Sequence, residues 1–347
     1  MKSFKKAIAL IIAAMLVLLC LASCGNNTSG EETTAPVTDN EDEATTAAPD
    51  NTVVNIAALK GPTGMGLAYL MEQNSLGSSA NKYNFFVETA ADSVIALLQS
   101  KQADIAALPS NAAATLYNKT NGNIKILAIN TLNVLRLLTS EEISSIEDLK
   151  GKTVYCAGEG TTVEYFASKI FSDCGLTVGE DVTIEFTAEH AETVALAKQG
   201  KAPIVILPEP FATQLLSTTE GYSEPVRIKD IIAEKNIPIV MGVYAVRTEF
   251  ANEHPELIKN FIKKDGVDSH KNLIANTEAV SALIEKYDIM KAPIAAAAVP
   301  NCTITFVSGN EMTATLDALF AMLLEVNPAS IGGKLPDSGI YYLSDNS

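Results

Sequence analysis

The feature that most constrains the fold is a pattern of strands and helices that occurs twice, about 99 residues apart. A buried strand is expected at 53–59, followed by a turn and a short helix. The same order begins again with a strand at 152–157 and a helix that opens on a capping box at 161–164. Strands that alternate with helices predict parallel sheets joined by right-handed crossovers. We therefore expect an α/β protein with two similar lobes.

The correspondence between the two copies continues downstream. In each copy we expect a strand (86–89 in the first copy, 185–187 in the second), then a helix (90–100 and 188–200), then a second strand (104–109 and 203–208). The two second strands match one residue out of register. Chance identities are the alternative in an alanine-rich chain, but the shared order of elements favours a repeat. In parallel sheets, ligands sit beyond the carboxyl ends of the strands, at helix N-termini. Two such lobes would place matched loops on either side of a central cleft.

The chain is expected to cross between the lobes twice. Apolar, strand-like segments within 124–139 lead out of the first lobe, and the segment 237–246 leads back. We therefore expect a first lobe made of 53–138 with 242–347, and a second lobe made of 139–241. Two crossings form a hinge pair, the arrangement used when domains close around a ligand.

Residues 1–23 are typical of an export signal. A lysine-containing start precedes an uncharged apolar stretch at 7–22, which is short for a membrane span. The segment Leu21–Cys24 resembles a bacterial lipobox, with cleavage before Cys24 and a lipid on its sulfur; an ordinary signal peptide is the alternative. Residues 24–52 are acidic and contain no basic residue, which predicts a solvated tether. We expect the protein to be lipid-anchored on the extracytoplasmic face of the cell membrane.

Composition excludes several classes of function. The chain has 41 acidic and 25 basic residues and a formal net charge of −16, which disfavours nucleic acid as a partner. Its three His and five Cys are scattered, so we expect no metal centre and no cofactor. Cys156, Cys174 and Cys302 are expected to be buried free thiols, with a Cys156–Cys174 bridge as the alternative. We expect a monomer.

Several segments together carry a resemblance to a known family. They are Leu59–Gly64 after the first strand, Gly160–Thr162 at the second turn, Leu207–Ala212 after a later strand, and Ser145–Val154. With the lipobox and the acidic tether, they resemble a solute-binding lipoprotein of an ABC importer, in the nitrate, taurine, aliphatic-sulfonate and thiamine-precursor class. The resemblance implies a periplasmic-binding-protein-like fold of type II, a small organic solute captured between the lobes, and an ABC permease as partner. The sequence contains no Gly-x-Ser-x-Gly, Walker A or His-Glu-x-x-His motif, so we expect no enzymatic activity.

Two other functions stay open beside this one. A lipoprotein of this fold can present its ligand to a sensor instead of a permease. Some relatives of the fold are enzymes that make the pyrimidine of thiamine, but that chemistry consumes an active-site histidine and uses iron. The three dispersed histidines disfavour the enzyme.

The candidate ligand-binding residues lie in the loops that the repeat would bring together. They are Lys60, Thr63, Tyr69, Thr89, Asp92, Ser110, Asn111, Glu159, Thr161, Thr162, His190, Glu209, Phe211 and Met241. Most have a structural alternative: the threonines and Ser110 can cap helices, the aromatic residues can belong to the core, and His190 can be a surface helix residue. Glu209 can be a rim carboxylate at a helix start.

The charges of these loops predict the charge of the solute. They contain Lys60 and several carboxylates, among them Glu159 and Glu209, so that negative charges outnumber positive ones. Burying an anion beside these carboxylates would cost several kcal/mol, whereas each helix N-terminus returns only ~0.3–2 kcal/mol. We therefore expect a neutral or amine-bearing solute, such as a nitrogen heterocycle, with Glu209 accepting its N–H groups and an aromatic ring covering its face.

Overall fold

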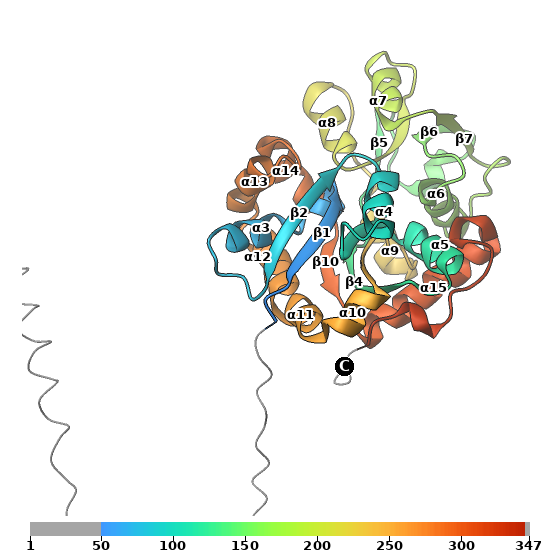
Figure 1. Cartoon of the computed structure of the whole chain (residues 1–347). Coiled ribbons are helices and arrows are strands. Elements are labelled where there is room, and N and C mark those ends of the chain that lie inside the picture. Colours follow the sequence, from blue (N-terminus) through green and yellow to red (C-terminus); the bar gives the residue numbers. More distant parts are fainter. Residues whose placement is uncertain (1–49, 344–347) are drawn as a thin grey trace, which may run out of the picture. The chain divides into compact units, whose positions relative to one another are not determined.

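The computed structural model describes residues 50–343 of the chain (Figure 1). The expected export signal, Cys24 and nearly all of the expected tether lie outside the described residues. Among the described residues, no helix is long and apolar enough to cross a membrane.

The first sheet of the described residues has six strands in the order β10-β4-β9-β3-β1-β2. Their bounds are Val53–Leu59 (β1), Lys82–Glu88 (β2), Ile105–Pro109 (β3), Ile124–Thr131 (β4), Gly242–Arg247 (β9) and Ile304–Val307 (β10). Strand β1 pairs in parallel with β2 and β3, and β9 runs antiparallel to both β3 and β4. Strands β1 to β4 therefore all run in the same direction and end at one edge of the sheet.

The second sheet has four strands in the order β5-β8-β6-β7. Their bounds are Leu135–Thr139 (β5), Thr153–Ala157 (β6), Thr183–Thr187 (β7) and Ile204–Pro208 (β8). Strand β6 pairs in parallel with β7 and β8, and β5 is antiparallel to β8. The order β9-β3-β1-β2 of the first sheet thus recurs as β5-β8-β6-β7, including the antiparallel strand. The expected repeat and the two-lobed α/β fold are confirmed.

The first crossing between the sheets comes earlier than the sequence indicated. The expected boundary followed residue 138, whereas Leu135–Thr139 already pairs with β8 in the second sheet. Only residues 132–134 separate β4 from β5. The returning segment runs beside them, since the amide of Met241 donates to the carbonyls of Thr131 and Leu132, at 3.0 Å each.

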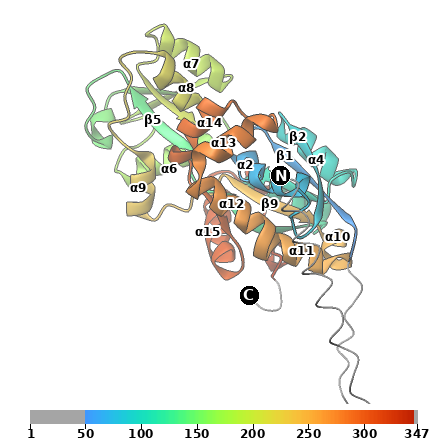
Figure 2. The same cartoon turned by 90° about the vertical axis from the view of Figure 1, so that its left-hand side faces the viewer.

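Helices cover both sheets (Figure 2). In the order of the chain, the α-helices are Pro62–Met65 (α2), Ala68–Ser75 (α3), Ala91–Gln99 (α4), Ser110–Thr120 (α5), Thr162–Asp173 (α6), His190–Lys198 (α7), Phe211–Thr218 (α8), Ile228–Lys235 (α9), Thr248–Glu253 (α10), Pro255–Asn260 (α11), Gly266–Ala275 (α12), Thr277–Lys286 (α13), Ala292–Ala298 (α14) and Asn310–Val326 (α15). A π-helical turn, Phe261–Asp265, joins α11 to α12. Short 3-10 helices lie at Ile146–Leu149, Val299–Asn301, Pro328–Ile331 and Ser338–Ile340.

The alternation of side chains along β1 divides the core of the first lobe. Ile56 and Ala58 face one apolar cluster and Ala57 faces another, as the two-residue period of a strand requires. The cluster around Ala57 continues into the second lobe and includes Phe166 of α6 and Phe320 of α15. Helix α14 of the first lobe also contacts α8 of the second (Figure 2). The two lobes therefore pack directly against each other beside the crossings.

The three cysteines among the described residues are free thiols. Cys156 is buried, and Cys174 and Cys302 are half-buried. Burial raises the pKa of Cys156 to about 12, so its thiol stays protonated and unreactive at neutral pH.

Candidate solute site at the strand ends

In the first lobe, the carboxyl ends of three neighbouring strands lie in one row. Pro109 at the end of β3 pairs with Gly242, and Gly242 pairs with Thr131 at the end of β4. Helix α5 begins immediately after β3, at Ser110, and α2 begins three residues after the end of β1. Of the candidate residues, Thr63, Ser110, Asn111 and Met241 lie at this edge.

Ser110 has a structural partner. Its side chain is fully buried, and its hydroxyl donates to the carbonyl of Val240 at 2.5 Å. Its amide donates to the carbonyl of Met241 at 3.2 Å. Ser110 therefore ties the start of α5 to the returning crossing, whereas the side chain of its neighbour Asn111 is half-buried at the same helix start.

Asn130, the residue before the end of β4, was not among the candidates. It is 1% exposed, and neither its Nδ2 nor its Oδ1 has a hydrogen-bond partner among the described residues. A Cβ atom added to Gly242 would lie 2.4 Å from Oδ1 of Asn130 and 2.6 Å from Cγ2 of Thr63. The three residues therefore meet at the strand ends. In the sequence, Asn130 is one of three polar residues of this strand, with Lys125 and Thr131, so composition alone does not single it out.

The matching edge of the second lobe carries an aromatic pair. His190 begins α7 after β7, and Phe211 begins α8 after β8. Their ring centroids are 5.3 Å apart, with the rings tilted by 43°. Burial lowers the pKa of His190, so the imidazole is neutral at neutral pH. Its Nδ1 is buried without a hydrogen-bond partner among the described residues.

Thr161 and Thr162 lie at the start of α6, beside the exposed Glu159. The hydroxyl oxygen of Thr161 accepts from the amide of Val163 at 3.3 Å, and the hydroxyl donates to the carbonyl of Gly158 at 2.6 Å. Thr161 is therefore the N-cap, as expected. The second bond of the expected capping box differs, because Glu164 accepts from the amide of Gly160, at 2.6 Å, and not from that of Thr161. Thr162 is buried at the first position of the helix.

Glu209 is engaged within the protein. Its Oε1 accepts from Nη1 of Arg136 at 2.8 Å and from the hydroxyl of Thr213 at 3.0 Å. Its Oε2 accepts from the amide of Thr213 at 3.1 Å. Arg136 in turn donates to Glu224, at 2.6 Å from Nη2. The carboxylate that was expected to accept N–H groups of a solute thus holds the start of α8 against β5.

Other candidate residues lie at the margin of this region or away from it. Thr89 and Asp92 are exposed in the loop after the edge strand β2 and at the start of α4. Lys60 is exposed, and its Nζ lies 2.6 Å from Asp288. Tyr69 lines a small hollow with Ser79, just before β2 begins, and so lies away from the strand ends.

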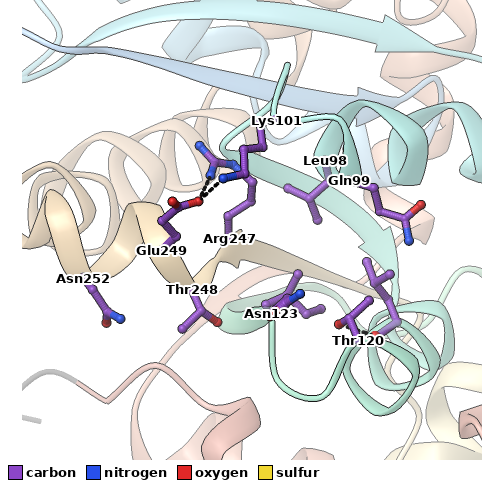
Figure 3. Close-up of a pocket in the computed structure, with 11 residues that line it drawn as sticks. Leu98, Gln99, Lys101, Thr120, Asn123, Arg247, Thr248, Glu249 and Asn252 are labelled. Atoms are coloured by element: carbon purple, nitrogen blue, oxygen red, sulfur yellow. Dashed lines mark hydrogen bonds and ion pairs between the residues drawn. The ribbon is translucent and has the colours of Figure 1, made fainter.

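A separate hollow of about 760 Å³ opens at the opposite edge of the first sheet (Figure 3). Its lining includes Ile124 at the start of β4 and Arg247 at the end of the antiparallel β9. In Figure 3, Lys101 and Arg247 both reach Glu249, at 2.5 and 3.3 Å. Arg247 also pairs with Asp104 at 2.6 Å. This hollow lies at the amino ends of the parallel strands, where ligands of such sheets are not held.

No family model matches the chain, and no curated protein matches it. Many solved structures share its fold. An ABC transporter protein from Parabacteroides distasonis aligns with a TM-score of 0.72 at 19% identity, over 85% of this chain and 100% of the other. The periplasmic aliphatic sulphonate binding protein of Escherichia coli aligns with a TM-score of 0.64 at 16% identity, over 84% and 94% of the two chains. The chain has the fold of a periplasmic binding protein.

The periplasmic-binding fold also occurs in a protein solved with a sulfinic acid. A mutant of DSZB in complex with biphenyl-2-sulfinic acid aligns with a TM-score of 0.56 at 11% identity, over 80% of this chain and 93% of that one. The described part of this chain contains no group of three or more His, Cys, Asp or Glu side chains that could hold a metal ion. His270, which is buried in the first lobe, bonds to the carbonyl of Gly266 and to Tyr244 and is not at the strand ends.

Proposed function

We propose that this protein is the solute-binding lipoprotein of an ABC importer, which captures a small organic solute between its lobes and delivers it to a permease. The observation that carries the proposal is the repeated strand order, in a fold shared over the whole length of an ABC transporter protein. That order gives each lobe a row of helix starts at the carboxyl ends of its parallel strands. Residues 132–134 and 237–241 would form the hinge, with lobe boundaries near those of the sequence analysis.

We further propose that the solute is uncharged. Three of the similar structures are named for sulfonates, and a sulfonate would need cationic partners. Here Arg136 is held by Glu209 and Glu224, and Lys60 lies exposed at the margin of the region, where it pairs with Asp288. His190 is neutral. An anion would therefore be buried without an ionic partner, at a cost of several kcal/mol.

The same pairing revises the expected role of Glu209. A carboxylate already neutralised by Arg136 no longer favours an amine, which leaves a neutral solute as the better match. Thr63, Asn111 and Thr162 would supply polar contacts, and the Phe211–His190 pair would offer one flat apolar face. A solute with a planar, conjugated skeleton fits that face.

Identification of bound molecules tests the function directly. Full-length protein would be isolated without unfolding, its small molecules released and identified by mass spectrometry, and each tested for its effect on the melting temperature of stripped protein. We expect a neutral molecule that stabilises the protein, by ~2.7 kcal/mol at 100-fold over its Kd. Phe211→Ala should lose most of this stabilisation. Tyr69→Phe is the control and should keep it, because Tyr69 lies away from the strand ends.

Two results would contradict the proposal in different ways. Stabilisation by taurine, nitrate or alkanesulfonates, with none by neutral solutes, would overturn the charge of the solute and leave the transport role intact. Protein that carries no small molecule as isolated, and is stabilised by no solute of any class, would overturn solute binding itself.

A further inference from the structure

At the strand ends of the first lobe lies a buried carboxamide, that of Asn130, for which the described part of the chain provides no hydrogen bond. Asn130 is 1% exposed, and both polar atoms of its side chain lack a partner among the described residues. Buried polar side chains nearly always have at least one hydrogen bond, so an amide with neither bond requires an explanation. Thr131, the next residue, is also buried with an unpaired hydroxyl.

Asn133, three residues further along the chain, is also a buried asparagine, but both polar atoms of its side chain are hydrogen-bonded. It is 3% exposed, nearly as deeply buried as Asn130. Its Oδ1 accepts from the amide of Leu135 at 3.0 Å, and its Nδ2 donates to the carbonyl of Leu135 at 3.2 Å. The two asparagines therefore differ in partners and not in burial. Residues 50–343 therefore supply no partner for Asn130, although its burial calls for one.

The surroundings of Asn130 place such a partner at the strand ends. Its Oδ1 lies so close to Gly242 that a Cβ there would come within 2.4 Å, and the methyl group of Thr63 borders the same spot. Gly242 is in register with Pro109, directly before the start of α5. The absence of a side chain at Gly242 thus leaves room for the amide of Asn130 in the row of helix starts where a solute would be held.

We infer that Asn130 is a specificity-determining residue, whose side chain forms hydrogen bonds with a donor and an adjacent acceptor on the edge of the solute. This inference rests on the proposed solute-binding function and narrows its ligand. A carboxamide presents one C=O acceptor beside one NH₂ donor. Its complement is a group with N–H next to C=O or next to a ring nitrogen: a primary amide, a lactam, or an amino-substituted azine. A sulfonate offers acceptors alone and would leave Oδ1 of Asn130 unpaired.

The test compares Asn130→Leu with the matched control Asn133→Leu. Leucine has nearly the shape of asparagine without its polar atoms. In the absence of added solute, Asn130→Leu should melt at or above the temperature of the full-length wild-type protein, because it removes two unpaired buried atoms. Asn133→Leu should melt several degrees lower, because the amide and the carbonyl of Leu135 lose their hydrogen bonds to the side chain of Asn133.

Binding supplies the second measurement, with uracil, cytosine, nicotinamide and 2-pyrrolidone as probes and ethanesulfonate and taurine as comparators. At least one of the four probes should raise the melting temperature of wild-type protein, and both comparators should not. For that probe, Kd should weaken about tenfold or more in Asn130→Leu. Asn130→Ala should lose binding in the same way, which covers the case in which leucine disturbs the packing near Gly242.

Three outcomes overturn the inference. The first is a ligand-free Asn130→Leu protein that is destabilised as much as Asn133→Leu, which would show that water or protein already satisfies the amide. The second is a probe that binds wild type and both Asn130 variants equally, in which case the importer function stands and Asn130 has no part in recognition. The third is a failure of all four probes to stabilise the wild type. The function itself fails only if the isolated protein also carries no small molecule.

Discussion

Glu209 joins three parts of the second lobe through its two carboxylate oxygens. It bonds to Arg136 on β5 and to Thr213 on α8, and Arg136 extends the network to Glu224 in the loop before α9. The side chain of Glu209 is fully buried, and that of Arg136 is 10% exposed. A buried charge that loses its partner is strongly destabilising, even where the intact pair contributes little.

Glu209→Gln should therefore lower the free energy of unfolding by about 2 kcal/mol, because it removes one of the two carboxylates that pair with the buried Arg136 and weakens the bonds to Thr213. Urea denaturation followed by circular dichroism measures the change. Glu159→Gln is the control, since Glu159 is exposed, and it should change stability by less than about 0.5 kcal/mol. A Glu209→Gln protein of wild-type stability that no longer binds solute would show that Glu209 contacts the solute and does not hold α8 against β5.

His270 gives the stability of the first lobe a dependence on pH. Burial lowers its pKa from 6.5 to about 4, against the opposing hydrogen bond to Gly266. A histidine with a lowered pKa in the folded state stabilises the protein above its unfolded pKa. That stability is lost as the pH falls through the folded value.

We expect the free energy of unfolding to fall by roughly 3 kcal/mol from this group between pH 6.5 and pH 4. His270→Asn should lose this contribution, so the difference between wild type and variant should shrink as the pH is lowered across that interval. Urea titrations at several pH values measure both. A difference that stays constant from pH 7 to pH 4 would show that His270 does not titrate in the folded protein below its usual range.

The roles of some of these residues could be predicted from the sequence, and the roles of others could not. The threonine cap of α6 was readable, because its partners lie within three residues of it. The pairing of Glu209 was not, because Arg136 is 73 residues away and the expected lobe boundary left it in the first lobe. Asn130 was missed because its importance lies in what does not bond to it. No local pattern reports that property.

At the scale of elements, α6 shows most directly how sequence produces structure. Val163, Phe166, Ala167, Ile170 and Phe171 recur at helical spacing, and all are buried. The side chain of Thr161 satisfies one of the free amides at the start of the helix. Helix, apolar face and cap were all predicted, because each depends on residues close together in the chain.

Thr161→Ala should lower the free energy of unfolding by about 1 kcal/mol, the usual value of a lost N-cap. Thr161→Ser keeps the hydroxyl and should stay close to wild type. Thermal unfolding of the three proteins measures the difference. Equal stability of the alanine and serine variants, together with weaker solute binding in alanine, would assign Thr161 to the ligand instead of to the helix.

Strand β5 shows where prediction at this scale stopped. The segments β4 and β5 are both apolar and β-like, so their composition does not say which sheet each joins. Pairing settles the assignment, since β5 lies antiparallel to β8, some 70 residues later in the chain. The repeat was predictable from the order of elements, whereas the place of the crossing depended on contacts distant in sequence.

At the scale of the whole molecule, the proposed importer function requires the protein to stay beside its permease. A lipid on Cys24 would provide this, and the acidic segment 24–52 would give the lobes reach. Cys24→Ala should release the protein from the membrane fraction, because a lone export signal leaves no anchor once it is removed. Fractionation of cells expressing wild type and variant, followed by immunoblotting, measures the release.

Cys20→Ala is the control, since Cys20 lies within the signal and should not affect anchoring. Retention of Cys24→Ala in the membrane fraction to the same extent as wild type would contradict the lipid anchor. It would leave solute binding unaffected, because the lobes are built from residues beyond the tether.

After each crossing, the chain enters the next sheet as an antiparallel strand. This strand is β5 in the second lobe and β9 in the first. The strands beside them, β3 and β8, would therefore sit next to the proposed hinge, whereas β2 and β7 lie at the far edges of their sheets from β9 and β5. Rotation about a pivot displaces a point in proportion to its distance from the axis. Asn130 and Ser110 would hardly move when the lobes close, whereas Thr89 and His190 would sweep the longest arcs. We expect changes near the pivot to alter which solute is chosen, and changes on the outer strands to alter how fast it is trapped.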